Sequence, residues 1–195
     1  MPKEEVCMSR KLGILIAFAC LCIAGLPRHA KAQDEAYTAS ATVSKDIGGG
    51  LVQFNFTITK WATQDEIKQL GAVLKEKGQN ALLDELKKLD AGRIRRVGDT
   101  GIQIAVAEKS QHGGKTIITL IAARQVSLGE AKYRGRTNST DYPFGFLQVQ
   151  LDDKGEGSGK MVTAAKIKYD KDGDAFRLDP FGNGATPVNN VKPLK

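Results

Sequence analysis

The chain has 195 residues, a formal net charge of +7 and three cysteines. The first 32 residues hold five of the 29 Lys and Arg and two of the 22 Asp and Glu, which leaves 24 basic and 20 acidic side chains, a net charge of +4, in residues 33–195. A charge of this size is ordinary for a soluble domain. All three cysteines also lie in the first 32 residues, so the rest of the chain has no disulfide and must be held together by its core.

The first 32 residues have the pattern of a secretory signal peptide. Lys3, Arg10 and Lys11 precede an apolar run from Leu12 to Leu26, and Ala30-Lys31-Ala32 is an A-x-A cleavage site. Fifteen apolar residues are fewer than the roughly 20 that a membrane-spanning helix needs. We therefore expect cleavage after Ala32, no membrane span afterwards, a periplasmic or extracellular location, and a single cysteine-free domain over 33–195. A lipid-anchored form at Cys20 is the alternative.

Two strands are predicted at the start of this domain. Residues 37–44 alternate small apolar and hydroxyl side chains, and residues 51–59 alternate Val52, Phe54, Phe56 and Ile58 with polar side chains. Such a period of two is typical of a strand with one buried face. The glycines at 48–50 can turn the chain between them.

The stretch from Trp61 to Gly92 is the most helical part of the chain. Thr63 and Glu66 have the spacing of a capping box, Gly78 can end a first helix, Asn80 can begin a second, and Gly92 can end it. This predicts a helical hairpin that packs on the neighbouring sheet. The apolar stripe that would face the sheet consists of Ile67, Leu70, Leu74, Leu82, Leu83, Leu86 and Leu89.

The remainder of the chain again predicts strands. Short turns separate them, which favours antiparallel pairing, and the strand at 116–121 is apolar on both faces, so we expect it to be covered on both. Pro180, Pro187 and Pro193 predict an edge-like or irregular tail. The expected fold class is α+β, a mostly antiparallel sandwich or partly closed barrel with an inserted helical hairpin. The predicted strands are 93–97, 102–107, 116–121, 146–151, 161–169 and 175–178.

Few residues in the predicted domain suit catalysis or metal binding. It has no cysteine nucleophile, and a Ser-His-Asp triad could form only through His112, which lies in a predicted turn. The acidic segment 170–174 has its glycine at the wrong position for a calcium loop, and the glycines at 155–159 lack the spacing of a phosphate loop. We therefore predict turns at both places, and no catalytic residue, metal site or cofactor.

The loop at 129–144 is the candidate binding site. Its arginines could bind a carboxylate or phosphate in a bidentate manner, so an anionic small molecule or envelope polymer is the candidate partner. In the alternative, the loop is structural, Asp141 pairs with an arginine, and Tyr142 and Phe144 fill the core. The candidate ligand-binding residues are Tyr133, Arg134, Arg136, Asp141 and Tyr142.

A basic strand and a helix pair suggest two other partners. Arg93, Arg95 and Arg96 could face an anionic polymer or lipid, or form a solvated edge. A nucleic-acid partner is not expected, because the second predicted helix contains Asp84 and Glu85 and an exported protein meets little DNA.

Several short segments resemble an uncharacterised family of small secreted bacterial proteins. They are Trp61 before a capped helix, the segments 75–78 and 141–144, and Gly155-Glu-Gly157. The resemblance implies a bacterial, exported setting and no catalytic residues.

Three functions remain open from the sequence. The absence of a catalytic motif favours a non-enzymatic envelope or extracellular domain that binds a ligand or partner. The alternatives are a structural or assembly protein that docks through its helical hairpin or a sheet edge, and a carboxylate-based hydrolase, which needs neither His nor Cys.

Overall fold

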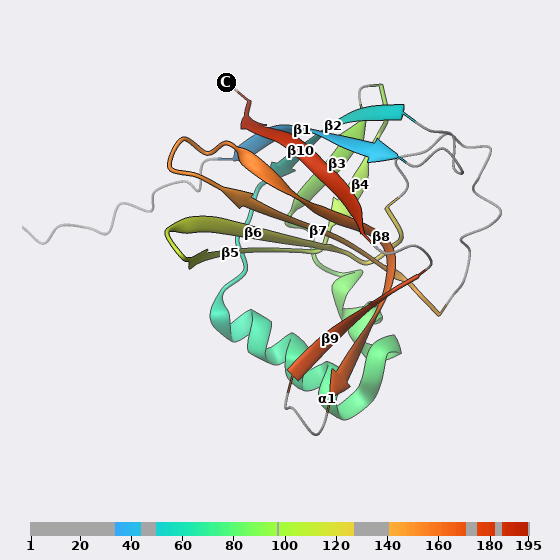
Figure 1. The fold of residues 1–195 in the computed structure, drawn as a ribbon. Helices are drawn as coiled ribbons and strands as arrows, with labels where there is room; N and C mark the ends of the chain where they lie inside the picture. The colour runs from blue at the N-terminus through green and yellow to red at the C-terminus, as the bar shows by residue number, and fades with distance from the viewer. Residues whose placement is uncertain are drawn as a thin grey trace, which may run out of the picture. The chain divides into compact units, whose positions relative to one another are not determined.

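The computed structural model is built mainly of antiparallel β-strands with one kinked helix (Figure 1). It describes residues 34–43, 50–96, 98–126, 141–170, 175–181 and 185–194, which belong to one compact unit. The predicted signal peptide and its cleavage site lie outside the described residues. The strands are β1 Glu35–Val43, β2 Gly50–Ile58, β3 Gly92–Arg96, β4 Ile102–Ile104, β5 Val106–His112, β6 Lys115–Ala122, β7 Phe144–Leu151, β8 Gly157–Asp170, β9 Ala175–Pro180 and β10 Thr186–Pro193.

The strands form one sheet that curls until its ends meet. Its order is β4-β3-β2-β1-β10-β8-β7-β6-β5, with β9 paired to β8. The first and last strands of this order are joined along the chain by Ala105 alone, whose backbone N–H donates to the Ile121 carbonyl of β6 at 2.8 Å. The sheet is therefore nearly closed and barrel-like, and the predicted antiparallel α+β class is confirmed.

Ala105 also reverses the side-chain alternation between β4 and β5. The predicted single strand over 102–107 would place Ile104 and Val106 on one face, because side chains alternate along a strand. In the structure Ile104 is buried inside the barrel, whereas Val106 packs outside it with the leucines of the helix. The prediction was wrong here because a bend at one residue changes which side chains point inward.

The inside of the barrel is filled by apolar side chains. Phe54, Phe56 and Ile58 of β2 are at most 1% exposed, as their alternation predicts, and Tyr37 of β1 stacks on Phe56 with ring centroids 5.0 Å apart. On β6, Ile118 and Leu120 point into the barrel, whereas Ile121 lies on the outer face against the helix cluster. This confirms the prediction that β6 is covered on both faces.

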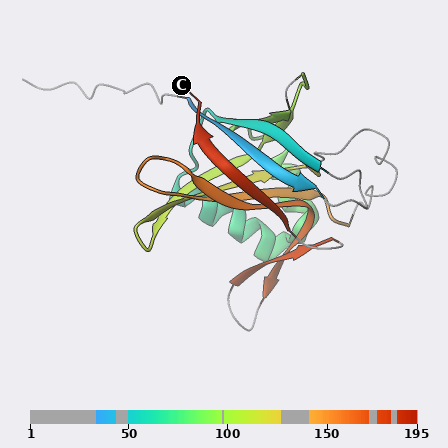
Figure 2. The ribbon, with the colours of Figure 1, turned by 45° about the horizontal axis from the view of Figure 1, so that its top comes forward.

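The helix α1, Gln64–Leu86, covers the outer face of β5–β8 (Figures 1 and 2). It begins with the predicted capping box: Thr63 Oγ1 accepts from the Glu66 N–H at 3.2 Å, and Glu66 Oε2 accepts from the Thr63 N–H at 2.8 Å. Two hydrogen bonds lower the pKa of Glu66 to about 2. The larger effect comes from Lys60 and the smaller one from the Thr63 backbone. Leu74, Leu82 and Leu86 are buried, as the apolar stripe predicts.

The predicted break between two helices is present: α1 consists of two helical segments that meet at a kink, where Gly78 has φ 81° and ψ −175°. The arrangement of the two segments as a hairpin stays a prediction. Gln79 holds the kink against the sheet: its Oε1 accepts from the Ile167 N–H at 3.1 Å and its Nε2 donates to the Asp141 carbonyl at 3.2 Å. The helix ends at Leu86, and Gly92, predicted as a helix stop, instead begins β3.

The C-terminal tail is the largest departure from the predicted strands. Despite Pro187 and Pro193, β10 lies inside the sheet order between β1 and β8. Its pairing with both neighbours is interrupted by a shift in register, and Asn190 takes a positive φ of 53°. These irregularities let a proline-containing segment occupy an interior position of a sheet.

None of the helical residues in the described part of the chain forms a stretch with the length and apolarity needed to cross a membrane.

Candidate functional site

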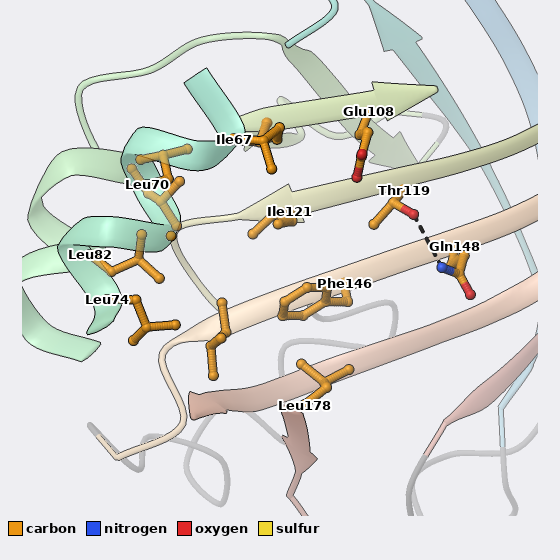
Figure 3. A pocket seen from close by; sticks show the side chains of 14 residues that line it. Ile67, Leu70, Leu74, Leu82, Glu108, Thr119, Ile121, Phe146, Gln148 and Leu178 are labelled. Carbon is orange, nitrogen blue, oxygen red and sulfur yellow. Dashed lines mark hydrogen bonds between the residues drawn. The ribbon is translucent and has the colours of Figure 1, made fainter. Parts of the chain in front are cut away.

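An apolar groove lies between α1 and the outer face of the sheet (Figure 3). Its volume is about 400 Å³, within the roughly 300–1,000 Å³ that ligand pockets usually occupy. One wall is the apolar face of α1 and the floor is formed by β5–β9. The apolar lining consists of Ile67, Leu70, Leu74, Leu82, Leu86, Val106, Ile121, Phe146, Ile167 and Leu178.

Three polar side chains close one end of the groove. Glu108 on β5 is paired in register with Thr119 on β6, and Thr119 is paired with Gln148 on β7, so the three form one row across the sheet. Gln148 Nε2 donates to Thr119 Oγ1 at 3.2 Å (Figure 3). Glu108 is half-buried, and no described side chain forms a hydrogen bond or ion pair with its carboxylate.

The strand alternation explains why apolar and polar parts of the groove meet so sharply. Outward-facing side chains recur every second residue along a strand. The row nearest α1 is Val106, Ile121 and Phe146, and the next row is Glu108, Thr119 and Gln148. A shift of two residues along each strand therefore leads from the apolar row that the helix covers to the polar row at the end of the groove.

The structure describes only the end of the predicted ligand-binding loop. Tyr133, Arg134 and Arg136 lie outside the described residues, so a site formed with Asp141 and Tyr142 stays a prediction. Lys166 Nζ brings the two described residues together, 3.8 Å from Asp141 Oδ2 and 4.4 Å from the centre of the Tyr142 ring. The Tyr142 ring also packs edge-on against Phe181, and Phe144 is fully buried.

The end of this loop is connected to the groove. Gln79, which holds the kink of α1, donates to the Asp141 carbonyl and accepts from the N–H of Ile167, a residue of the groove floor. The leucine stripe and the strand alternation are both visible in the sequence, but neither pattern shows how far a helix stands from a sheet, so the groove was not predicted.

A second hollow, of about 400 Å³, lies beside Glu35 and Trp61. The Glu35 carboxylate accepts from Tyr37 Oη at 2.8 Å, Trp61 Nε1 at 3.2 Å and Lys109 Nζ at 2.8 Å, and Lys109 Nζ also lies 4.5 Å from the centre of the Trp61 ring. Burial alone would raise the pKa of Glu35, but these hydrogen bonds and the charge of Lys109 together lower it. The pKa of Tyr37 is raised, mainly by burial and to a smaller extent by the Glu35 carboxylate. Tyr37, Trp61 and Lys109 already donate hydrogen bonds to the Glu35 carboxylate, so it is not free to bind a ligand. The cluster therefore links β1, β5 and the segment before α1 and has a structural role.

We expect Glu35→Gln to reduce stability more at pH 7 than at pH 3. A carboxyl group whose pKa is lowered on folding contributes stability above its unfolded-state pKa, about 4.3, and loses that contribution as the pH falls through the folded pKa. Urea denaturation of the wild type and of E35Q at both pH values measures this difference. Glu76→Gln, a change at an exposed carboxylate of α1, is the control. A gap between wild type and E35Q that does not shrink at pH 3 would contradict the assignment.

Two other sequence candidates are ordinary surface features, whereas residues 171–174 of the predicted acidic turn lie outside the described residues. His112 is exposed at the end of β5, next to the turn at Gly113 and Gly114. Asp152 Oδ1 accepts from the backbone N–H groups of Lys154 and Glu156, both at 2.9 Å, and this closes the turn by residue 156, so β8 starts earlier than predicted. Within the described ranges no group of three or more His, Cys, Asp or Glu side chains could hold a metal ion.

Fold and groove together define a barrel-like β domain with a filled interior and an apolar groove on its outside. Comparisons of the chain with family models, with curated proteins and with solved structures found no match. The function therefore has to be inferred from the groove itself.

Proposed function

We propose that the chain is an exported, non-enzymatic binding domain whose ligand lies in the groove between α1 and β5–β9. The observation that carries this proposal is the combination of a volume of about 400 Å³ with an apolar lining and one polar end. Binding sites for small molecules are usually concave and mostly apolar, with a few placed polar groups that orient the ligand. An elongated ligand with an apolar body and a polar head fits this arrangement.

The groove also differs from an ordinary packing gap. The cluster between helix and sheet is well packed around Leu74, Leu82, Leu86 and Phe144, which are at most 6% exposed. Ile67, Leu70, Ile121 and Phe146 beside it are only partly buried. Solvated apolar side chains that face one another across a hollow favour a ligand, because covering them removes apolar surface from water.

A groove-filling variant tests the proposal. Ile121→Trp places a large side chain on the groove floor, so we expect the binding of an apolar fluorescent probe such as N-phenyl-1-naphthylamine to fall at least about tenfold. Ile117→Trp is the matched control, because Ile117 lies on the same strand and the same outward face but does not line the groove. Probe fluorescence is titrated for the wild type and both variants, with circular dichroism to confirm folding.

Equal binding by the two tryptophan variants would contradict the groove as the ligand site. Absence of probe binding to the wild type, together with concentration-dependent self-association in light scattering, would instead favour the structural or assembly alternative.

Export remains part of the proposal. It is supported by the signal-peptide pattern, the cysteine-free remainder of the chain and the resemblance to small secreted bacterial proteins. Cleavage after Ala32 would place the domain in the periplasm or outside the cell. The mass of the protein recovered from the periplasmic fraction and the medium tests this, since an uncleaved chain confined to the cytoplasm would rule it out.

A further inference from the structure

We propose that the groove selects an amphiphile whose head is a primary ammonium group, bound at Glu108. This inference rests on the proposed function, because it names the class of ligand that the same groove would take. The ligand's alkyl chain would lie along the apolar lining, and its nitrogen would reach the row of polar side chains at the end of the groove.

The Glu108 carboxylate lacks a counter-charge. It is half-buried in the groove and has no described partner, although other half-buried carboxylates in the described residues have one, for example Glu35 with Lys109 and Glu66 with Lys60. A carboxylate removed from water without a counter-charge is unfavourable. A cationic head would therefore gain more at this position than a neutral one, and an anionic head would be repelled.

No cation among the described residues already occupies the position beside Glu108. Lys109, the next residue along β5, is engaged by Glu35. Lys160 continues the polar row on β8, in register with Gln148. It stands three strand spacings from Glu108, roughly 14 Å at about 4.8 Å per strand, and does not line the groove. Neither Lys109 nor Lys160 therefore competes with a ligand cation for the Glu108 carboxylate.

Hydrogen bonding selects an ammonium with N–H groups. Gln148 uses its Nε2 to donate to Thr119, so its Oε1 remains an acceptor in the same row. The row thus offers oxygen acceptors, Glu108 and Gln148, and a primary ammonium group has three donors. A quaternary ammonium has the charge but no donor, so it should bind less tightly.

The test uses four dodecyl compounds with the purified protein, each below its critical micelle concentration. They are dodecylammonium, dodecyltrimethylammonium, dodecyl maltoside and dodecanoate, and their dissociation constants are measured by isothermal titration calorimetry. We expect dodecylammonium to bind at least about tenfold more tightly than dodecanoate, and Glu108→Gln to remove that preference, because hydrogen bonds to a charged group are among the stronger ones. Glu76→Gln removes the same charge at an exposed site of α1 and should leave the preference intact.

The outcomes separate this inference from the proposed function. If all four compounds bind alike, if Ile121→Trp weakens them all and if Glu108→Gln changes nothing, head-group selection is wrong and the groove as a ligand site stands. If dodecanoate binds best, the inference is overturned in favour of an anionic head. If none of the four binds, both the inference and the proposed groove function are overturned.

Discussion

Phe56→Ala is expected to lower the free energy of unfolding by about 3–5 kcal/mol, the usual cost of removing a buried phenylalanine. The Phe56 side chain is fully buried in the barrel interior and stacks on Tyr37 with ring centroids 5.0 Å apart. Its loss would leave a cavity at a point where β1, β2 and β3 meet, since Phe56 is in register with Tyr37 on one side and Ile94 on the other. Barrel strands cannot move inward to fill such a cavity without breaking their pairing.

Urea denaturation followed by the fluorescence of Trp61 measures this cost, because the sequence contains one tryptophan and it packs on the edge of the barrel core. Leu51→Ala on the same strand is the control. Leu51 is 63% exposed, and surface substitutions usually change stability by less than about 0.5 kcal/mol. If Phe56→Ala does not fold, Phe56→Leu provides a smaller cavity with the same sign. Equal effects at positions 51 and 56 would mean that the barrel interior is not the main core.

The second large effect is expected at Gly92, where β3 begins. Gly92 has φ 139°, and a Cβ at this position would lie 2.0 Å from the Thr57 carbonyl oxygen of β2. An alanine there must displace backbone atoms in addition to adopting an unfavourable φ. Backbone strain of this kind costs roughly 1–3 kcal/mol, and overpacking adds roughly 1–3 kcal/mol, so Gly92→Ala should destabilise the protein by several kcal/mol.

Gly50→Ala separates the two contributions. Gly50 also begins a strand and has a positive φ of 117°, but a Cβ there would have no atom within 4 Å. Its substitution therefore reports the cost of φ alone, and the excess cost at Gly92 reports the contact with Thr57. Thermal and urea unfolding of the two variants give this difference. Equal destabilisation would show that β2 and β3 can separate without loss, contrary to the close register between Ile58 and Gly92.

The sequence predicted local elements well where one side chain acts on its near neighbours. The capping box of Thr63 and Glu66 spans three residues, and it is present with both hydrogen bonds. The alternation of Phe54, Phe56 and Ile58 correctly predicted which face of β2 is buried, because every second side chain of a strand points to the same side. The break at Gly78 was also correct, because two helical segments of α1 meet at a kink there.

The predictions failed where distant segments decide the outcome. The tail became an interior strand because β1 and β8 both pair with it, which the prolines at 187 and 193 do not reveal. The change of face between Ile104 and Val106 depends on the closure of the sheet at Ala105. The groove depends on the separation between α1 and the strands beneath it, which no local pattern shows.

By itself the sequence determined the antiparallel α+β class, the start of the helix, the apolar stripe on it and the buried faces of the central strands. These follow from periodicity and from hydrogen bonds between residues a few positions apart. The tertiary structure alone decided that the sheet nearly closes on itself, and that Glu108, Thr119 and Gln148 form one row at the end of an apolar groove. Residues from three strands become neighbours only through pairing between segments far apart in the chain, and no local pattern contains that information.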